Sequence, residues 1–143
     1  MRTPAMRFLW PILLVLFTIT QAQTPPELAG TWRAKMIVDQ AEFAKQPKDF
    51  QKLIQSQVDK FKKRPWTVTL RKDGAYHLPL DHGQSEEGIW ASKDLRLHLR
   101  VKKESGKKVA VAKERVDKFD VAADKKSFRM KLTPYITVEY VKG

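Results

Sequence analysis

The sequence predicts a mainly β protein: a single antiparallel up-and-down β-barrel of about eight strands, with a helical insert after the first strand. Three observations predict this fold class. Most segments after residue 65 alternate apolar and polar residues with a period of two, which is typical of half-buried strands. The turns between them are short, so consecutive strands are expected to be antiparallel neighbours. One stretch, 39–63, changes to helical spacing. Closure of such a meander would bury its apolar face and remove exposed sheet edges.

The first 22 residues have the three-part layout of a secretory signal peptide. Arg2 and Arg7 precede a nearly unbroken apolar run over 8–19, and Thr20-Gln21-Ala22 supplies small residues for cleavage. The run is shorter than the ~20 residues of a spanning helix and contains a proline, which disfavours the alternative of an uncleaved membrane anchor. We therefore expect a signal peptide over 1–22, an extended leader over 23–28 and a barrel domain over 29–143. The mature protein would be secreted or periplasmic and would not span a membrane.

Composition restricts how the domain is stabilised and which partners it is expected to bind. The 143-residue chain has no cysteine, so disulfides are excluded and the fold depends on core packing. Its formal net charge of +12 falls to +10 once the two arginines of the signal peptide are removed. Such a charge favours anionic partners. After export we expect an anionic envelope surface as a partner rather than nucleic acid.

The first strand and the helical insert differ in their period. From Trp32 to Val38 alternate residues are apolar, with Arg33 and Lys35 on the other face. Asp39 and Glu42 have the spacing of a capping box, so a helix is expected to begin at Asp39. Pro47 interrupts that helix and is accepted in the first turn of a new one. The prediction is a helix-turn-helix or one kinked helix over 39–63, ended by Arg64-Pro65. Its apolar residues recur at helical spacing: Phe50, Leu53, Ile54, Val58 and Phe61.

The rest of the chain alternates between strands and turns. The expected strands are 66–70, 76–80, 88–91, 95–101, 128–132 and 136–141. Asp73-Gly74 is the pair favoured in a tight hairpin between the first two of these. The segment 109–121 is open between one long bent strand and a strand with an irregular link.

Two short motifs carry a resemblance to a known family. Leu28-Ala29-Gly30-Thr31-Trp32 and Gly88-Ile89-Trp90-Ala91 resemble the Gly-x-Trp strands of the lipocalin-like (calycin) group, in short bacterial secreted domains. The resemblance implies a barrel in which Trp32 packs across the closed end under a basic side chain of the last strand. Lys142 stands where that family usually has an arginine, and the family's Thr-Asp-Tyr motif and cysteine pair are missing. The helical insert resembles the lid of fatty-acid-binding proteins.

The sequence contains no recognisable catalytic or cofactor motif. It has no cysteine nucleophile, no Gly-x-Ser-x-Gly and no phosphate-binding glycine loop, so we expect neither an enzyme nor a cofactor. Alternation places His77 and His98 on the solvent face of their strands. His82 shares a loop with Asp81, Glu86 and Glu87, which could bind a divalent ion, but an ordinary polar loop is the favoured interpretation. No metal ligand is therefore predicted.

Large aromatic and apolar side chains on the expected inner faces are the candidate binding residues. Such side chains either fill an eight-stranded barrel or surround one small ligand. The candidates are Trp32, Met36, Phe50, Ile54, Trp66, Tyr76 and Trp90. The first hypothesis is a secreted carrier of a small apolar or amphiphilic ligand under the helical lid. The alternative is a filled barrel that acts as an envelope-associated binding module for an anionic polymer, lipid surface or protein.

Overall fold

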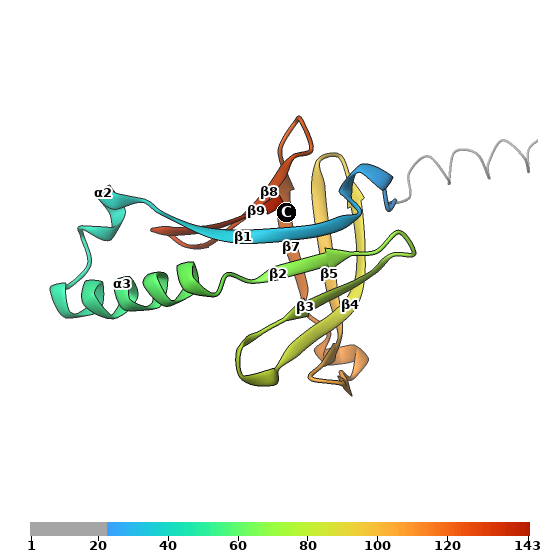
Figure 1. Ribbon diagram of the computed structural model, residues 1–143, viewed down its shortest axis with the longest axis horizontal. Helices are drawn as coiled ribbons and strands as arrows, with labels where there is room; N and C mark the ends of the chain where they lie inside the picture. The colour runs from blue at the N-terminus through green and yellow to red at the C-terminus, as the bar shows by residue number, and fades with distance from the viewer. Residues whose placement is uncertain (1–22) are drawn as a thin grey trace, which may run out of the picture.

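The computed structural model describes residues 23–143, and the predicted signal peptide over 1–22 lies outside the described residues. Eight antiparallel strands close into a barrel, which stands at the right of Figure 1. Their bounds are β1 Gly30–Val38, β2 Thr67–Leu70, β3 Ala75–Pro79, β4 Ser85–Lys93, β5 Arg96–Glu104, β7 Val116–Val121, β8 Ser127–Thr133 and β9 Ile136–Lys142. A two-residue strand, β6 Lys107–Lys108, pairs only with β5.

Strand pairing confirms the predicted up-and-down barrel. Strand β1 pairs with both β2 and β9, so the first and last strands meet, and β5 pairs with both β4 and β7. Along β1 the predicted alternation is present, because Trp32 and Ala34 are buried while Arg33 and Lys35 are exposed. The Asp73-Gly74 turn joins β2 and β3 as predicted. No unpaired edge is left among the eight strands.

One end of the barrel, at the start of β1, is closed by packed side chains. Trp32 is fully buried, and its indole Nε1 donates to the Leu28 carbonyl at 2.9 Å. Its ring packs edge-on against Phe128 at 4.9 Å between ring centroids. The Lys142 Nζ lies 5.2 Å from the centroid of the Trp32 ring. A basic side chain of the last strand therefore covers this tryptophan, as the resemblance implies.

The extended leader predicted over 23–28 is instead folded onto the closed end. Pro26–Leu28 forms a short 3-10 helix, η1, and Leu28 is buried. Gln23 exchanges two backbone hydrogen bonds with Ser92, at 3.0 and 2.6 Å. The physical reason is that Leu28 fills the barrel end and its carbonyl accepts the Trp32 indole hydrogen bond. This segment is part of the domain.

The helical insert consists of two helices, α2 Gln40–Phe43 and α3 Lys48–Lys63. The Asp39 carboxylate caps α2 by accepting from the Glu42 amide at 3.2 Å. The reciprocal capping bond is absent, since the Glu42 carboxylate pairs with Lys45. Pro47 lies just before α3 rather than in its first turn. In Figure 1 both helices extend to the left of the barrel, with α3 below β1.

The ambiguous segment 109–121 adopts the irregular alternative. A 3-10 turn, η3 Val111–Lys113, precedes β7, which begins only at Val116. The link is held by Glu114, whose side chain is 5% exposed and binds Lys102 at 2.9 Å and Arg100 at 3.6 Å. A third 3-10 turn, η2 Asp81–Gly83, joins β3 to β4.

Candidate functional site

A groove of about 880 Å³ lies at the open end of the barrel, beneath the C-terminal half of α3. Three elements form it: the end of β1, the segment from α3 into β2, and the loop between β3 and β4. Its residues are Met36, Gln57, Lys60, Phe61, Lys63, Arg64, Trp66, Leu80, Asp81 and His82. The helical insert therefore creates a concave surface that the barrel alone would not have.

The floor of the groove is apolar. Phe61 is buried at the end of α3, and its ring meets Trp66 edge-on at 5.1 Å between centroids. Met36 from β1 and Leu80 from the β3–β4 connection complete the floor. Met36 and Leu80 are only partly buried and pack against the core cluster. Apolar surface of this kind, left partly uncovered in a concave site, is typical of a small-molecule site.

The rim of the groove is basic. Lys60 and Lys63 come from the last turn of α3 and Arg64 is its C-cap, where positive charge is favoured by the helix dipole. Asp81 is the single carboxylate that lines the groove. The rim therefore carries three positive charges against one negative charge, apart from His82.

His82 lies in a strained turn at this rim, with a φ of 59°. Asp81 lines the groove beside it, whereas the other two carboxylates of this loop pair elsewhere: Glu86 binds Arg115, and Glu87 lies 3.3 Å from His77. Within 23–143 no group of three or more histidine, cysteine or acidic side chains is arranged to hold a metal ion. His82 therefore lines the same groove as Lys60, Lys63 and Trp66.

The structure separates the seven candidate binding residues into three groups. Met36 and Trp66 line the groove. Phe50 and Ile54 lie at the other half of α3, where Ile54 packs on the cluster of Phe43, Tyr135 and Ile136. Trp32, Tyr76 and Trp90 are almost fully buried in the main core. Only the first pair shares one concave surface.

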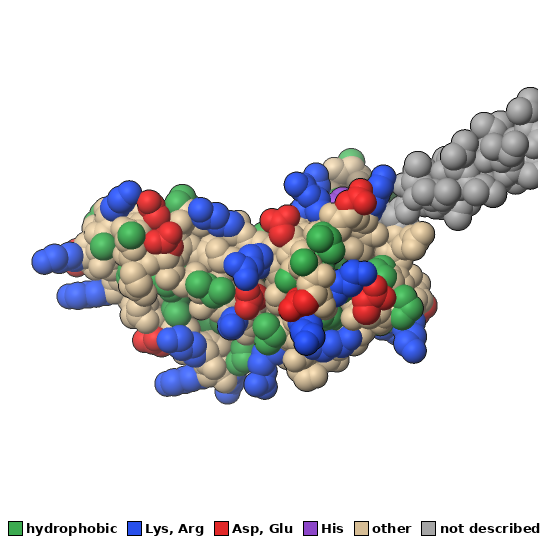
Figure 2. Space-filling view, turned by 90° about the horizontal axis from the view of Figure 1, so that it is seen from above, with side chains coloured by type: hydrophobic (Ala, Val, Ile, Leu, Met, Phe, Trp, Pro, Cys, Tyr) green, Lys and Arg blue, Asp and Glu red, His purple; other side chains and the backbone are tan. Residues whose placement is uncertain are grey.

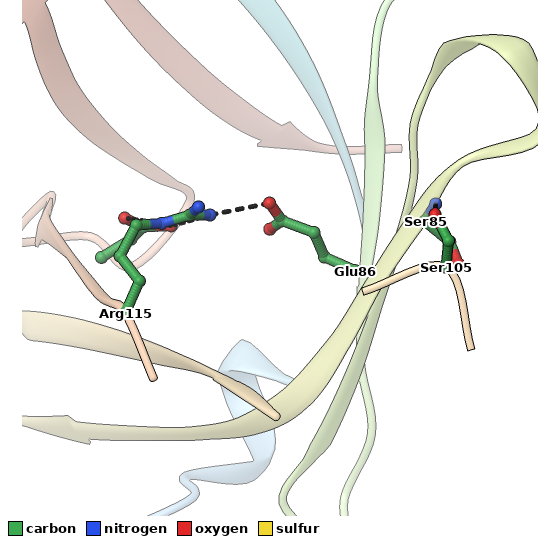
Figure 3. Close-up of polar contacts among 5 residues, drawn as sticks. Ser85, Glu86, Ser105 and Arg115 are labelled. Atoms are coloured by element: carbon green, nitrogen blue, oxygen red, sulfur yellow. Dashed lines mark hydrogen bonds and ion pairs between the residues drawn. The ribbon is translucent and has the colours of Figure 1, made fainter. Parts of the chain in front are cut away.

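A second polar group, which we name the interior cluster, lies inside the same end of the barrel. It consists of Tyr76, Glu86, Arg115, Asp117 and Tyr140. Arg115 donates to Glu86 Oε1 at 2.7 Å and to Asp117 Oδ1 at 3.0 Å. Figure 3 shows Arg115 and Glu86 reaching toward one another, while Ser85 lies on the opposite side of β4. These hydrogen bonds, first to Asp117 and then to Glu86, raise the pKa of Arg115.

Sequence reasoning missed the interior cluster. Asp117 stands two residues before Phe119, so the period of β7 places both on the inner face. That signal was present in the sequence. Glu86 was harder to place, because a register shift between Glu87 and Gly88 interrupts the alternation of β4.

Comparisons of this chain with protein-family models, with curated proteins and with solved structures find no match. Within the described part of the chain, no helix has the length and apolar character needed to cross a membrane.

Proposed function

We propose that this protein binds a small apolar or amphiphilic molecule in the groove between α3 and the barrel. One observation carries the proposal: an apolar floor and a basic rim meet in a concave surface of about 880 Å³. Volumes of this size are those of sites for small molecules. The apolar part of the ligand would lie on Met36, Phe61, Trp66 and Leu80.

The packing of the core supports binding at the mouth rather than deep in the barrel. Phe119, Phe128 and Tyr140 form a continuous aromatic group with centroid distances of 5.0–5.9 Å. Together with Trp32 and Trp90 they occupy the space that a deep ligand would need. An eight-stranded barrel is only wide enough for such side chains or for one small ligand.

Within this proposal, the protein is a lipocalin-like carrier without catalytic activity, and it acts outside the cytoplasm. The cover of Trp32 by Lys142 supports the family assignment, and the layout of residues 1–22 supports export. The basic rim favours a ligand whose polar end is a carboxylate or phosphate.

The test is a fluorescence titration with decanoate, followed by the same titration of rim variants. We expect saturable binding that weakens by about tenfold in the Lys60→Glu/Lys63→Glu variant, because two attractive charges become repulsive. Lys62→Glu is the matched control, since Lys62 belongs to the same helical turn and does not line the groove. Absence of saturable binding by the unaltered protein would contradict the proposal. So would equal losses in the rim variant and the control.

The alternative function is an envelope-associated module that binds an anionic surface. The packed interior and the net charge of +12 favour it. On the face shown in Figure 2, however, the basic side chains are spread among acidic ones rather than gathered in one patch. Retention on anionic vesicles that is lost in high salt, in a protein that binds no decanoate, would favour this alternative.

A further inference from the structure

Four side chains of the interior cluster come from strands, and the fifth, Arg115, comes from the link before β7. Tyr76 and Tyr140 belong to the core, and Asp117 shares the inner face of β7 with Phe119. Glu86 is the second residue of β4, and Arg115 directly precedes β7. Strand β5 lies between β4 and β7, so the Arg115–Glu86 ion pair reaches across β5.

The Tyr76 hydroxyl is the buried polar group of this cluster that lacks a partner within the described chain. The residue is 2% exposed, and within the described chain its hydroxyl has no hydrogen-bond partner. A buried hydroxyl without a partner is destabilising, so such groups are rare in folded proteins. Its ring lies against Gly88, the residue opposite it on β4, where an added Cβ would come within 2.8 Å of Tyr76 Cε1. Gly88 therefore lets the ring lie along β4, two residues from Glu86.

The interior cluster has one more negative than positive charge. The Arg115 guanidinium binds both oxygens of Asp117 but only Oε1 of Glu86. Burial first, and then the charges of Glu86 and Asp117, raise the pKa of both Tyr76 and Tyr140. Both hydroxyls therefore stay protonated at neutral pH, and each keeps an oxygen that can accept a hydrogen bond.

The cluster meets solvent at Arg115. The Arg115 side chain is 51% exposed, whereas that of Glu86 is 13% exposed. A small polar group can therefore approach Glu86 past the guanidinium.

We propose that the interior cluster binds the primary ammonium group of a small organic amine. An ammonium carries one positive charge and three N–H donors. The charge matches the excess of one carboxylate in the cluster. The donors match the second oxygen of Glu86, which Arg115 leaves free, and the hydroxyl oxygen of Tyr76, which has no partner within the described chain. This site differs from the groove in its residues and in the sign of the ligand it selects, so it goes beyond the proposed function.

The test is a calorimetric titration with hexylammonium and, separately, with hexanoate. The net charge of +12 attracts hexanoate over long range, so a preference for hexylammonium can come only from local contacts. We expect saturable binding of hexylammonium that is at least about tenfold tighter than that of hexanoate. No binding of hexylammonium, or equal binding of the two probes, would overturn the proposal.

Two variants locate the site. Glu86→Gln keeps a hydrogen-bond acceptor for Arg115 but removes the excess charge, so hexylammonium affinity should fall by about tenfold. Glu87→Gln is the matched control, because its carboxylate pairs with His77 away from the cluster, and its affinity should not change. Tyr76→Phe keeps the ring and removes only the hydroxyl, so it too should bind hexylammonium more weakly. Unchanged binding in both Glu86→Gln and Tyr76→Phe would overturn the assignment.

The two proposals fail separately. Binding of decanoate without binding of hexylammonium would support the groove and overturn the ammonium site. Binding of hexylammonium without binding of decanoate would support the ammonium site and contradict the groove proposal, since Lys60 and Lys63 take no part in the interior cluster.

Discussion

The two ends of the barrel differ in how well their buried polar groups are hydrogen-bonded. At the closed end each buried indole has a partner: Trp32 donates to the Leu28 carbonyl, and Trp90 donates to the Arg71 carbonyl at 2.8 Å. At the open end the buried Tyr76 hydroxyl has no partner within the described chain, and Met36 and Trp66 of the groove are only partly buried. Satisfied, packed groups stabilise a fold, while unsatisfied groups and uncovered apolar surface are typical of binding sites. Together with the proposed function, the difference places stability at one end and recognition at the other.

Truncation of a tryptophan at each end is the most severe test of this comparison. Trp32→Ala should lower the free energy of unfolding by about 3–5 kcal/mol, because it empties a fully buried site. Trp66→Ala should lower it by less, since Trp66 is only partly buried beside the groove. Urea denaturation of both variants measures the difference. Equal losses would show that the mouth contributes as much to stability as the closed end.

Alkaline pH tests the burial of the two interior tyrosines. Their raised pKa values mean that the folded state holds these protons more tightly than the unfolded state. The stability they support is intact below the ordinary tyrosine pKa of about 10 and is lost as pH rises above it, by about 1.4 kcal/mol per pH unit for each tyrosine. Urea denaturation at pH 9 and pH 11 should show this decline, and Tyr140→Phe should make it shallower. An identical decline in the variant would show that other groups cause it.

Loss of the charge above Trp32 should have the smallest effect. Lys142→Met removes the contact of Nζ with the indole ring and its hydrogen bond to the Glu27 carbonyl. We expect a decrease of about 0.5–1 kcal/mol in the free energy of unfolding, the range of an exposed cation–π contact. Lys131→Met, at an exposed position of β8, is the control and should be close to neutral. An unchanged free energy of unfolding in Lys142→Met would show that this side chain does not stabilise the closed end.

Local patterns in the sequence predict most of this fold. The alternation of Trp32, Ala34 and Met36 identifies β1 and its inner face, and Asp73-Gly74 identifies a hairpin, because both signals act within a few residues. The folding of Leu28 onto the barrel could not be predicted in this way. Its burial depends on strands that are distant in sequence, through contacts such as Glu27–Lys125 at 2.7 Å.

The candidate site was predictable only in part, for a related reason. Period-two spacing shows which side chains point inward, but not how far along the barrel each one lies. Trp32 and Met36 share one face of β1, yet they lie toward opposite ends of the barrel. The position of Trp66 beside Phe61 depends on how α3 returns to β2, which helical spacing does not determine.

An NMR titration that follows the tryptophan indole N–H signals tests the central claim most directly. Trp66 lies in the groove, while Trp32 and Trp90 report on the closed end. With decanoate, we predict that the Trp66 signal shifts in a saturable way and that the signals of Trp32 and Trp90 keep their positions. A shift of the Trp32 and Trp90 signals with an unmoved Trp66 signal would place the ligand inside the barrel and contradict binding at its mouth.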